Sequence, residues 1–172
     1  MYDAELREYE PALVTPESRE FAKYLFERFS QFQCFAKMER SPGTPWNLIV
    51  EIPSPIGVNE MNLLITVEHV DDMEEPSVFF GRWHTHERCE TLGRPESSPH
   101  VFILDLIEGI ISDRYALAND PVPFDSEELL DLDDPDSILD ALTCRYSPDA
   151  IVLRSWTGKH NRTVRIEDLN TQ

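Results

Sequence analysis

The feature that most constrains the fold is a series of β-type segments joined by short connections between residues 46 and 86. Residues 46–52 (WNLIVEI) and 61–67 (MNLLITV) are rich in β-branched and aliphatic side chains, and residues 77–86 (SVFFGRWHTH) form a third such segment. Prolines on either side of Ser54 end the first segment, because proline cannot donate to a strand ladder. Short connections favour antiparallel neighbours. We therefore predict a meander of three or four antiparallel strands.

Two main helices are predicted beside this meander. Thr15-Pro16-Glu17 combines a capping hydroxyl, a proline at the first helical position and an acid near the positive end of the helix dipole. Apolar side chains then recur at helical spacing from Phe21 onward. Ser98-Pro99 begins a second helix with a broad apolar face over residues 102–111. Residues 32–38 fit either the end of the first helix or a strand, and both readings stay open.

The C-terminal part adds a short helix and a hairpin. Asp134-Pro135 opens the helix, and the β-rich runs 150–156 and 163–166 are joined by a turn that contains Gly158. The predicted fold is α+β, with one mainly antiparallel sheet of about five to six strands and the two main helices packed on one face. We expect a single domain over residues 1–172, with residues 1–14 as a flexible N-terminal segment.

The charge is strongly acidic and unevenly distributed. The chain has 33 Asp and Glu against 15 Lys and Arg, a formal charge of −18. This balance argues against a nucleic-acid binder and against docking on anionic lipid, because both need a large basic surface. No Lys or Arg lies between Arg40 and Arg82, or between Arg114 and Arg145.

The acid-rich stretches predict a surface that attracts a basic protein partner. The composition is similar to that of bacterial inhibitors of basic nuclease toxins and of DNA-mimicking proteins. The alternative is a solvated face that only keeps the protein in solution. The predicted partner surface comprises nine acids: Asp71, Asp72, Glu74, Glu75, Glu127, Glu128, Asp131, Asp133 and Asp134.

Residues 82–90 form the densest polar cluster in the chain, with side chains that can bind a metal ion or an anion. His84 and His86 share one face if the strand continues to His86, and two imidazoles at this spacing suit zinc. Glu87 is the nearest third ligand, with further choices at Glu68, His69, Cys89, Glu90 and His100. The alternative is a pair of strand-end histidines that only bond to neighbours. The arginines nearby also suit an anionic ligand, which defines a candidate ligand site of Arg82, His84, His86, Arg88 and His100.

Part of this cluster resembles the MPN/JAMM metalloprotease signature. The resemblance covers Gly81, His84, Thr85 and His86. Glu87 stands where that family has proline, Arg94 stands where it has serine, and no aspartate follows at the required spacing. The chain is therefore not assigned to that family.

The sequence favours a non-enzymatic, immunity- or inhibitor-like module that recognises a basic partner and needs no cofactor. The alternative is a metal-dependent hydrolase or metal-binding protein with zinc at His84 and His86. Three widely spaced cysteines and an acidic start without an apolar leader predict a cytoplasmic protein. The longest uncharged run, residues 41–50, is ten residues long, whereas about 20 are needed to span a bilayer.

Overall fold

The fold is α+β and contains two antiparallel sheets, one of six strands and one of four. The computed structural model describes residues 4–70, 73–86, 100–119, 127–144, 150–165 and 167. The chain divides into two compact units: residues 1–53, 62–80 and 84–106 belong to unit 1, and residues 54–61, 81–83 and 107–172 belong to unit 2. The predicted α+β class with mainly antiparallel pairing is confirmed, and the structure adds a second sheet.

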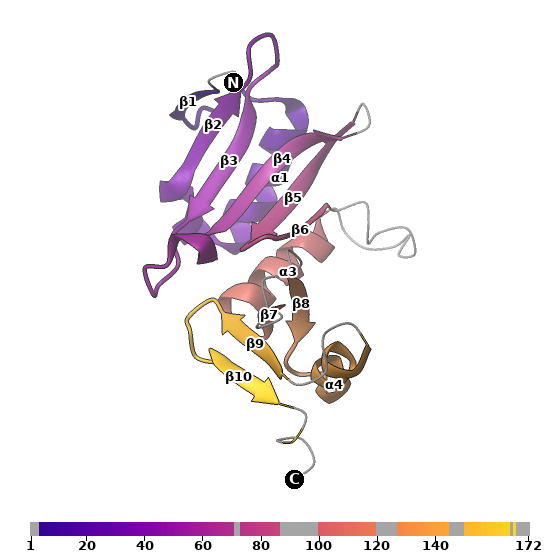
Figure 1. Cartoon of the computed structure of the whole chain (residues 1–172). Coiled ribbons are helices and arrows are strands. Elements are labelled where there is room, and N and C mark those ends of the chain that lie inside the picture. The colour runs from indigo at the N-terminus through magenta and orange to yellow at the C-terminus, as the bar shows by residue number, and fades with distance from the viewer. Residues whose placement is uncertain are drawn as a thin grey trace. The chain divides into compact units, whose positions relative to one another are not determined.

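The six-stranded sheet is a meander in which each strand pairs with the next strand along the chain (Figure 1). Its strands are β1 (Glu5–Glu8), β2 (Ala36–Arg40), β3 (Asn47–Ile52), β4 (Leu63–Val70), β5 (Met73–Phe80) and β6 (Trp83–His86). The predicted third segment, 77–86, is two strands, because Gly81 adopts a φ of +62° and interrupts it. The acid-rich residues from Met73 to Pro76 belong to β5: Pro76 pairs with Val67, and pairing with the apolar strand β4 outweighs low local propensity.

The N-terminal segment contains a strand that sequence reasoning did not predict. β1 pairs with β2, with Glu5 opposite Arg40. The Arg40 guanidinium donates to Glu5 over 2.9 Å and lies 4.5 Å from the centre of the Trp46 ring, which Arg7 also approaches at 5.1 Å. These contacts come from residues distant in the sequence, so a four-residue polar segment carries no local signal for them.

Helix α1 (Pro16–Arg28) begins as predicted. The Thr15 side chain accepts a hydrogen bond from the Ser18 N–H at 3.2 Å, and Pro16 occupies the first turn. The Ser18 hydroxyl in turn accepts from the Leu48 N–H at 3.0 Å and ties the helix to β3. Residues 32–38 were predicted to be either the end of the helix or a strand, and the structure contains both: a 3-10 helix (Ser30–Phe35) leads directly into β2.

The first sheet has one apolar face and one polar face. Alternate strand residues are fully buried beside Phe21 and Leu25 of α1, and these residues are Leu48, Val50, Ile65, Val78 and Phe80. Figure 1 shows α1 behind the strands. The intervening side chains of β2, β3 and β4, which point to the other face, are half-buried or exposed: Lys37, Glu39, Ile49, Glu51, Thr66 and Glu68. On β5, the side chains that share this face by register, Glu75 and Ser77, are buried.

Unit 2 is built around the second sheet, in the order β10-β9-β7-β8. Its strands are β7 (Tyr115–Asn119), β8 (Glu128–Asp131), β9 (Ala150–Ser155) and β10 (Arg162–Arg165). The predicted C-terminal hairpin is β9–β10, and it belongs to this sheet rather than to the meander. β8 was not predicted, because its acidic surroundings conceal the buried Leu130. Ala141 of helix α4 (Pro135–Cys144) packs into the same apolar cluster.

Helix α3 (Val101–Ile111) runs from unit 1 into unit 2, and its Ile103, Ile107 and Ile110 are fully buried. The predicted start of this helix at Ser98-Pro99 lies outside the described residues. A short 3-10 turn (Asn59–Met61) precedes β4. Among the described residues, no helix combines the length and apolarity that crossing a membrane requires.

Candidate binding site

A pocket of about 540 Å³ lies in unit 1 at the end of the sheet where β2 turns into β3. The turn supplies one wall, and β4 and β5 supply another. The polar residues that line it are Glu39, Arg40, Ser41, Thr44, Asn47, Thr66, Glu68 and Glu74, together with Gly43, Pro45 and Val67. Register explains part of this set, because Glu39 pairs with Asn47 across β2 and β3, and paired residues share a face.

The turn that forms one wall follows directly from the sequence. Pro42 and Gly43 occupy the central positions, Gly43 has a φ of +87°, and the Thr44 N–H donates to the Ser41 carbonyl at 3.1 Å. Proline followed by a residue with positive φ is typical of a type II turn. The Thr44 hydroxyl also donates to that carbonyl at 2.9 Å and accepts from the Ser41 N–H at 3.0 Å. The wall is therefore held by local bonds.

The pocket carries an excess of negative charge. Glu39, Glu68 and Glu74 line it, against a single base, Arg40. Arg40 is already bound to Glu5 and stacked on Trp46. Within the part of the chain that the structure describes, none of the three carboxylates pairs with a Lys or Arg side chain. The pocket therefore favours a positively charged occupant.

Two acceptor atoms of the lining residues have no hydrogen-bond donor among the residues that the structure describes. These are Asn47 Oδ1 and Glu74 Oε2, both fully buried. A buried acceptor without a donor costs about 1–3 kcal/mol. The Thr66 hydroxyl does not offset this cost, because it donates to the Leu48 carbonyl at 3.0 Å. Both acceptors belong to residues that line the pocket, so an occupant could donate N–H groups to them only after the Asn47 or Glu74 side chain rotates.

The histidines of β6 lie together in unit 1. The ring centroids of His84 and His86 are 5.5 Å apart. His84 is exposed and stacks on Phe79 at 5.2 Å. His86 Nδ1 lies 2.6 Å from Ser77 Oγ, 3.6 Å from Glu68 Oε2 and 4.0 Å from Glu75 Oε1. Glu68, one of the third ligands considered from the sequence, thus lies beside His86 and also lines the pocket.

The remaining members of the predicted ligand site are placed elsewhere or not described. His100 packs on Phe21 and Tyr24 of α1, with ring centroids 5.2 Å and 5.5 Å away. Arg82 belongs to unit 2, where its N–H donates to Glu127 Oε2 at 2.6 Å. Glu87 and Arg88 lie outside the described residues. No group of three or more His, Cys, Asp or Glu suited to a metal occurs within residues that the structure describes.

The predicted acidic partner surface is divided by the structure. Glu74 lines the pocket, whereas Glu75 is only 6% exposed. The Glu127 side chain is 5% exposed and accepts from Arg154, from Asn119 at 3.0 Å and from the Arg82 N–H. Glu128 is half-buried in β8, and Asp71 and Asp72 lie outside the described residues. Glu75 and Glu127 therefore contribute to the interior more than to a partner surface.

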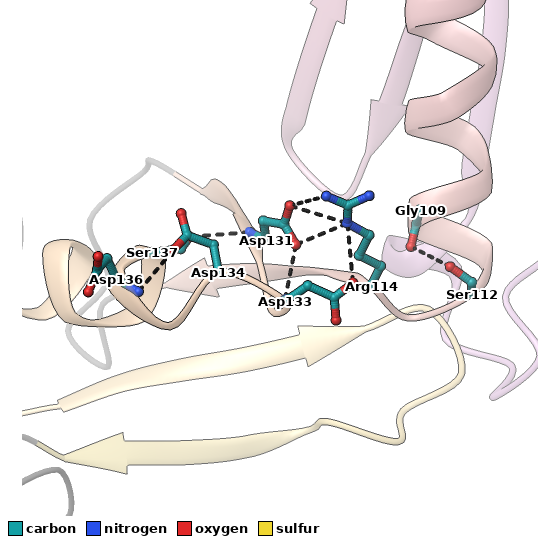
Figure 2. A network of polar contacts seen from close by, with 8 residues as sticks. All are labelled: Gly109, Ser112, Arg114, Asp131, Asp133, Asp134, Asp136 and Ser137. Atoms are coloured by element: carbon teal, nitrogen blue, oxygen red, sulfur yellow. Dashed lines mark hydrogen bonds and ion pairs between the residues drawn. The ribbon is translucent and has the colours of Figure 1, made fainter.

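The other three acids of that surface form a local network in unit 2 (Figure 2). Asp131 accepts from Arg114 Nη2 at 2.6 Å, and this hydrogen bond lowers the pKa of Asp131 and raises that of Arg114. Asp133 lies 3.6 Å from the same guanidinium, and its N–H donates to Asp131. Asp134 accepts from the Asp136 N–H at 3.1 Å near the start of α4. These carboxylates hold the β8–α4 connection.

Sequence reasoning missed Glu39, Glu68 and Asn47 as members of one site. The spacing along the chain separates them, and only the antiparallel register brings their strands together. The available signal was the length of the connections, which predicts the meander but not its register. No protein-family model, curated protein or solved structure matches this chain. The fold and the pocket are thus the only basis for a functional argument.

Proposed function

We propose that this chain is a non-catalytic binding module that recognises a basic protein partner, and that the pocket at the β2–β3 turn receives a positively charged side chain of that partner. The observation that carries the proposal is the combination, in one pocket, of three carboxylates and two buried acceptors. Within the described ranges, no Lys or Arg side chain pairs with these carboxylates and no donor reaches these acceptors. An inhibitor or immunity protein that blocks a basic target is the particular form we favour.

Electrostatics supports this assignment. β3, β4 and β5 contain Glu51, Glu68, Glu74 and Glu75 but no Lys or Arg. A basic partner approaching these three strands meets more acidic than basic side chains, although Lys37 and Arg40 of β2 lie beside them, and its association is accelerated over about 10 Å at 0.1 M salt. Three widely spaced cysteines favour a reducing compartment, so the partner is sought in the cytoplasm.

The size and chemistry of the pocket support a side chain as its occupant. A volume of about 540 Å³ lies within the range of roughly 300–1,000 Å³ typical of small-ligand pockets. A guanidinium carries five donors, and an ammonium three. Either group can supply the donors that Asn47 and Glu74 lack, after small rotations of these side chains.

The test measures binding of a fluorescein-labelled octa-arginine peptide by fluorescence anisotropy at increasing NaCl. Wild-type protein should bind at low salt and weaken as salt rises. Replacing Glu39 and Glu68 together by Gln should weaken binding by about 2- to 30-fold, since exposed or half-exposed pairs contribute about 0.2–1 kcal/mol each and tenfold in affinity corresponds to about 1.4 kcal/mol. The matched control replaces Glu20 and Glu27, both exposed on α1, and removes the same charge.

Two results would contradict the proposal. If the wild-type protein does not bind the peptide even at low salt, the acidic surface has no function in capturing a basic partner. If the control with Gln at 20 and 27 loses as much affinity as the pocket variant, net charge governs binding and the pocket does not.

A further inference from the structure

We infer, resting on the function proposed above, that the basic partner presents an apolar side chain between its basic ones and docks it on an apolar stripe of the six-stranded sheet. The stripe is formed by Ile49 of β3, Leu64 of β4 and Phe79 of β5. It lies on the open face, by which we mean the face of the sheet turned away from α1 (Figure 1). All three side chains belong to unit 1 and are half-buried.

The strand register brings the three apolar side chains together. Leu64 pairs directly with Phe79, and Ile49, which pairs with Thr66, lies one diagonal step from Leu64. Side chains in direct and diagonal positions on one face are within reach of one another. His84 of β6 extends the stripe, because its ring stacks on Phe79 with the centroids 5.2 Å apart. A contiguous line of side chains therefore crosses four adjacent strands.

The apolar character of the stripe is unusual for this face. An antiparallel sheet with one packed face usually carries polar side chains on the other. The three stripe residues depart from this pattern and keep part of their apolar surface in contact with solvent. Contiguous apolar surface of this kind marks interaction sites. An apolar group that covers the stripe removes this surface from water and gains affinity.

The stripe and the pocket share the open face. Glu68, which lines the pocket, is four positions from Leu64 on β4 and therefore points to the same side. Glu39, a second pocket residue, pairs with Asn47, which is two positions from Ile49 on β3. Four positions along a strand span roughly 13 Å. A partner whose basic side chain occupies the pocket can therefore contact the stripe with a neighbouring residue.

Acidic side chains border the stripe on this face. Glu51 pairs with Leu64, and Glu39 and Glu68 lie toward the pocket. Among the described strand residues of this face, Lys37 is the one Lys or Arg. Protein interfaces commonly have an apolar centre and a polar rim. Because the rim here is acidic, charge complementarity favours an apolar anchor flanked by basic side chains over a second copy of this chain, which would bring the same acids.

The experiment compares two fluorescein-labelled octapeptides of equal charge by fluorescence anisotropy. One has the sequence Arg-Arg-Leu-Arg-Arg-Leu-Arg-Arg, and the other has serine in place of both leucines. Wild-type protein should bind the leucine peptide about 3- to 10-fold more tightly, since partly covering a leucine side chain removes apolar surface from water. Leu64→Thr should reduce this preference to less than about twofold and leave the affinity for the serine peptide unchanged. The matched control Leu13→Thr, at a leucine that is 46% exposed and outside the strands, should keep the wild-type preference.

Three results would overturn the inference. Equal affinity of the wild-type protein for the two peptides, or an unchanged preference in Leu64→Thr, shows that the stripe does not receive the leucines. A wild-type dimer that Leu64→Thr dissociates in sedimentation velocity shows that a second copy covers the stripe instead. Each of these results leaves the proposed function intact if octa-arginine still binds in the pocket. Absence of binding of all three peptides rejects the proposed function and this inference together.

A second measurement uses the wild-type protein alone, in case Leu64→Thr does not fold. Methyl NMR follows the Ile49 and Leu64 methyl groups during titration with each octapeptide, and the Leu13 methyl groups serve as the reference. The leucine peptide should shift the Ile49 and Leu64 resonances more than the serine peptide does. Equal shifts from the two peptides, or shifts confined to Leu13, overturn the inference.

Discussion

Replacing Gly81 by alanine is expected to destabilise unit 2, to which Gly81, Leu117 and Glu127 all belong. Gly81 has a φ of +62°, which costs an L-residue about 1–2 kcal/mol. A Cβ at this position would also lie 2.5 Å from Leu117 Cδ1 and would collide with the carboxylate of Glu127. Glu127 cannot move freely, since it holds Arg154, Asn119 and the Arg82 N–H.

The expected loss of stability combines the backbone cost of the positive φ with the cost of crowding Leu117 and Glu127. Overpacking against a buried side chain costs typically about 1–3 kcal/mol, and loss of a buried hydrogen bond costs about 1–3 kcal/mol. The two overlap, so we expect Gly81→Ala to lower the free energy of unfolding by about 3–5 kcal/mol in total. Gly57→Ala is the matched control: its φ is +70°, it belongs to the same unit, and a Cβ there meets nothing within 4 Å. It should lose only the backbone cost of about 1–2 kcal/mol.

Urea denaturation followed by tryptophan fluorescence and by far-ultraviolet circular dichroism measures both variants, and agreement of the two signals checks for a single transition. The reduced backbone entropy of the unfolded chain affects the two variants alike, so their difference isolates the crowding at Gly81. Equal losses in the two variants would refute the reasoning, because they would show that Glu127 yields without cost.

Three further predictions concern single interactions. Asp131→Asn should lower the free energy of unfolding at neutral pH and make that free energy decline less steeply in acid. The pKa of Asp131 in the folded state lies below its ordinary value of 3.8, so its stabilising effect is present above about pH 4 and is lost as the pH falls. An acid-unfolding curve that is unchanged from wild type contradicts this prediction. Glu127→Gln should cost about 2–3 kcal/mol in urea denaturation because it leaves Arg154 without its charged partner, and Glu20→Gln should cost almost nothing. Elemental analysis, together with thermal melting with and without a chelator, tests the zinc alternative. Stoichiometric zinc that is lost in His84→Ala supports a metal site. A protein that contains no zinc and has the same melting temperature with and without the chelator excludes that site.

The parts of the fold that sequence reasoning predicted are those with strong local signals. Thr15 and Pro16 define the start of α1, and the turn that contains Gly158 joins β9 to β10. The β-rich segments and short connections predict an antiparallel meander, which the structure confirms. In each of these cases the physical cause lies within a few residues of the element itself.

The parts that were missed depend on partners far along the chain. β1 is held by Arg40, which is 35 positions from Glu5. The acidic composition around β8 indicates a loop, and only the pairing of Leu130 with Ala116 shows that the segment is a strand. Charge density likewise predicted nine surface acids, but it could not distinguish Glu74, in the pocket, from Glu127, which is buried in an ion pair. The composition therefore predicts the sign of the charge of the expected partner, whereas the strand register determines which carboxylates lie in the pocket.

Glu74 offers a test of whether the pocket is kept for binding at the expense of stability. Its Oε2 is buried and receives no hydrogen bond from the part of the chain that the structure describes, and such a group costs about 1–3 kcal/mol in a folded protein. Glu74→Met keeps the length of the side chain and removes both oxygens, so the free energy of unfolding should rise by about 1 kcal/mol. The same variant should bind octa-arginine more weakly. A gain in stability together with a loss of binding is the pattern expected of a functional residue. A loss of stability would show instead that Glu74 supports the fold, and the argument from its missing donor would fail.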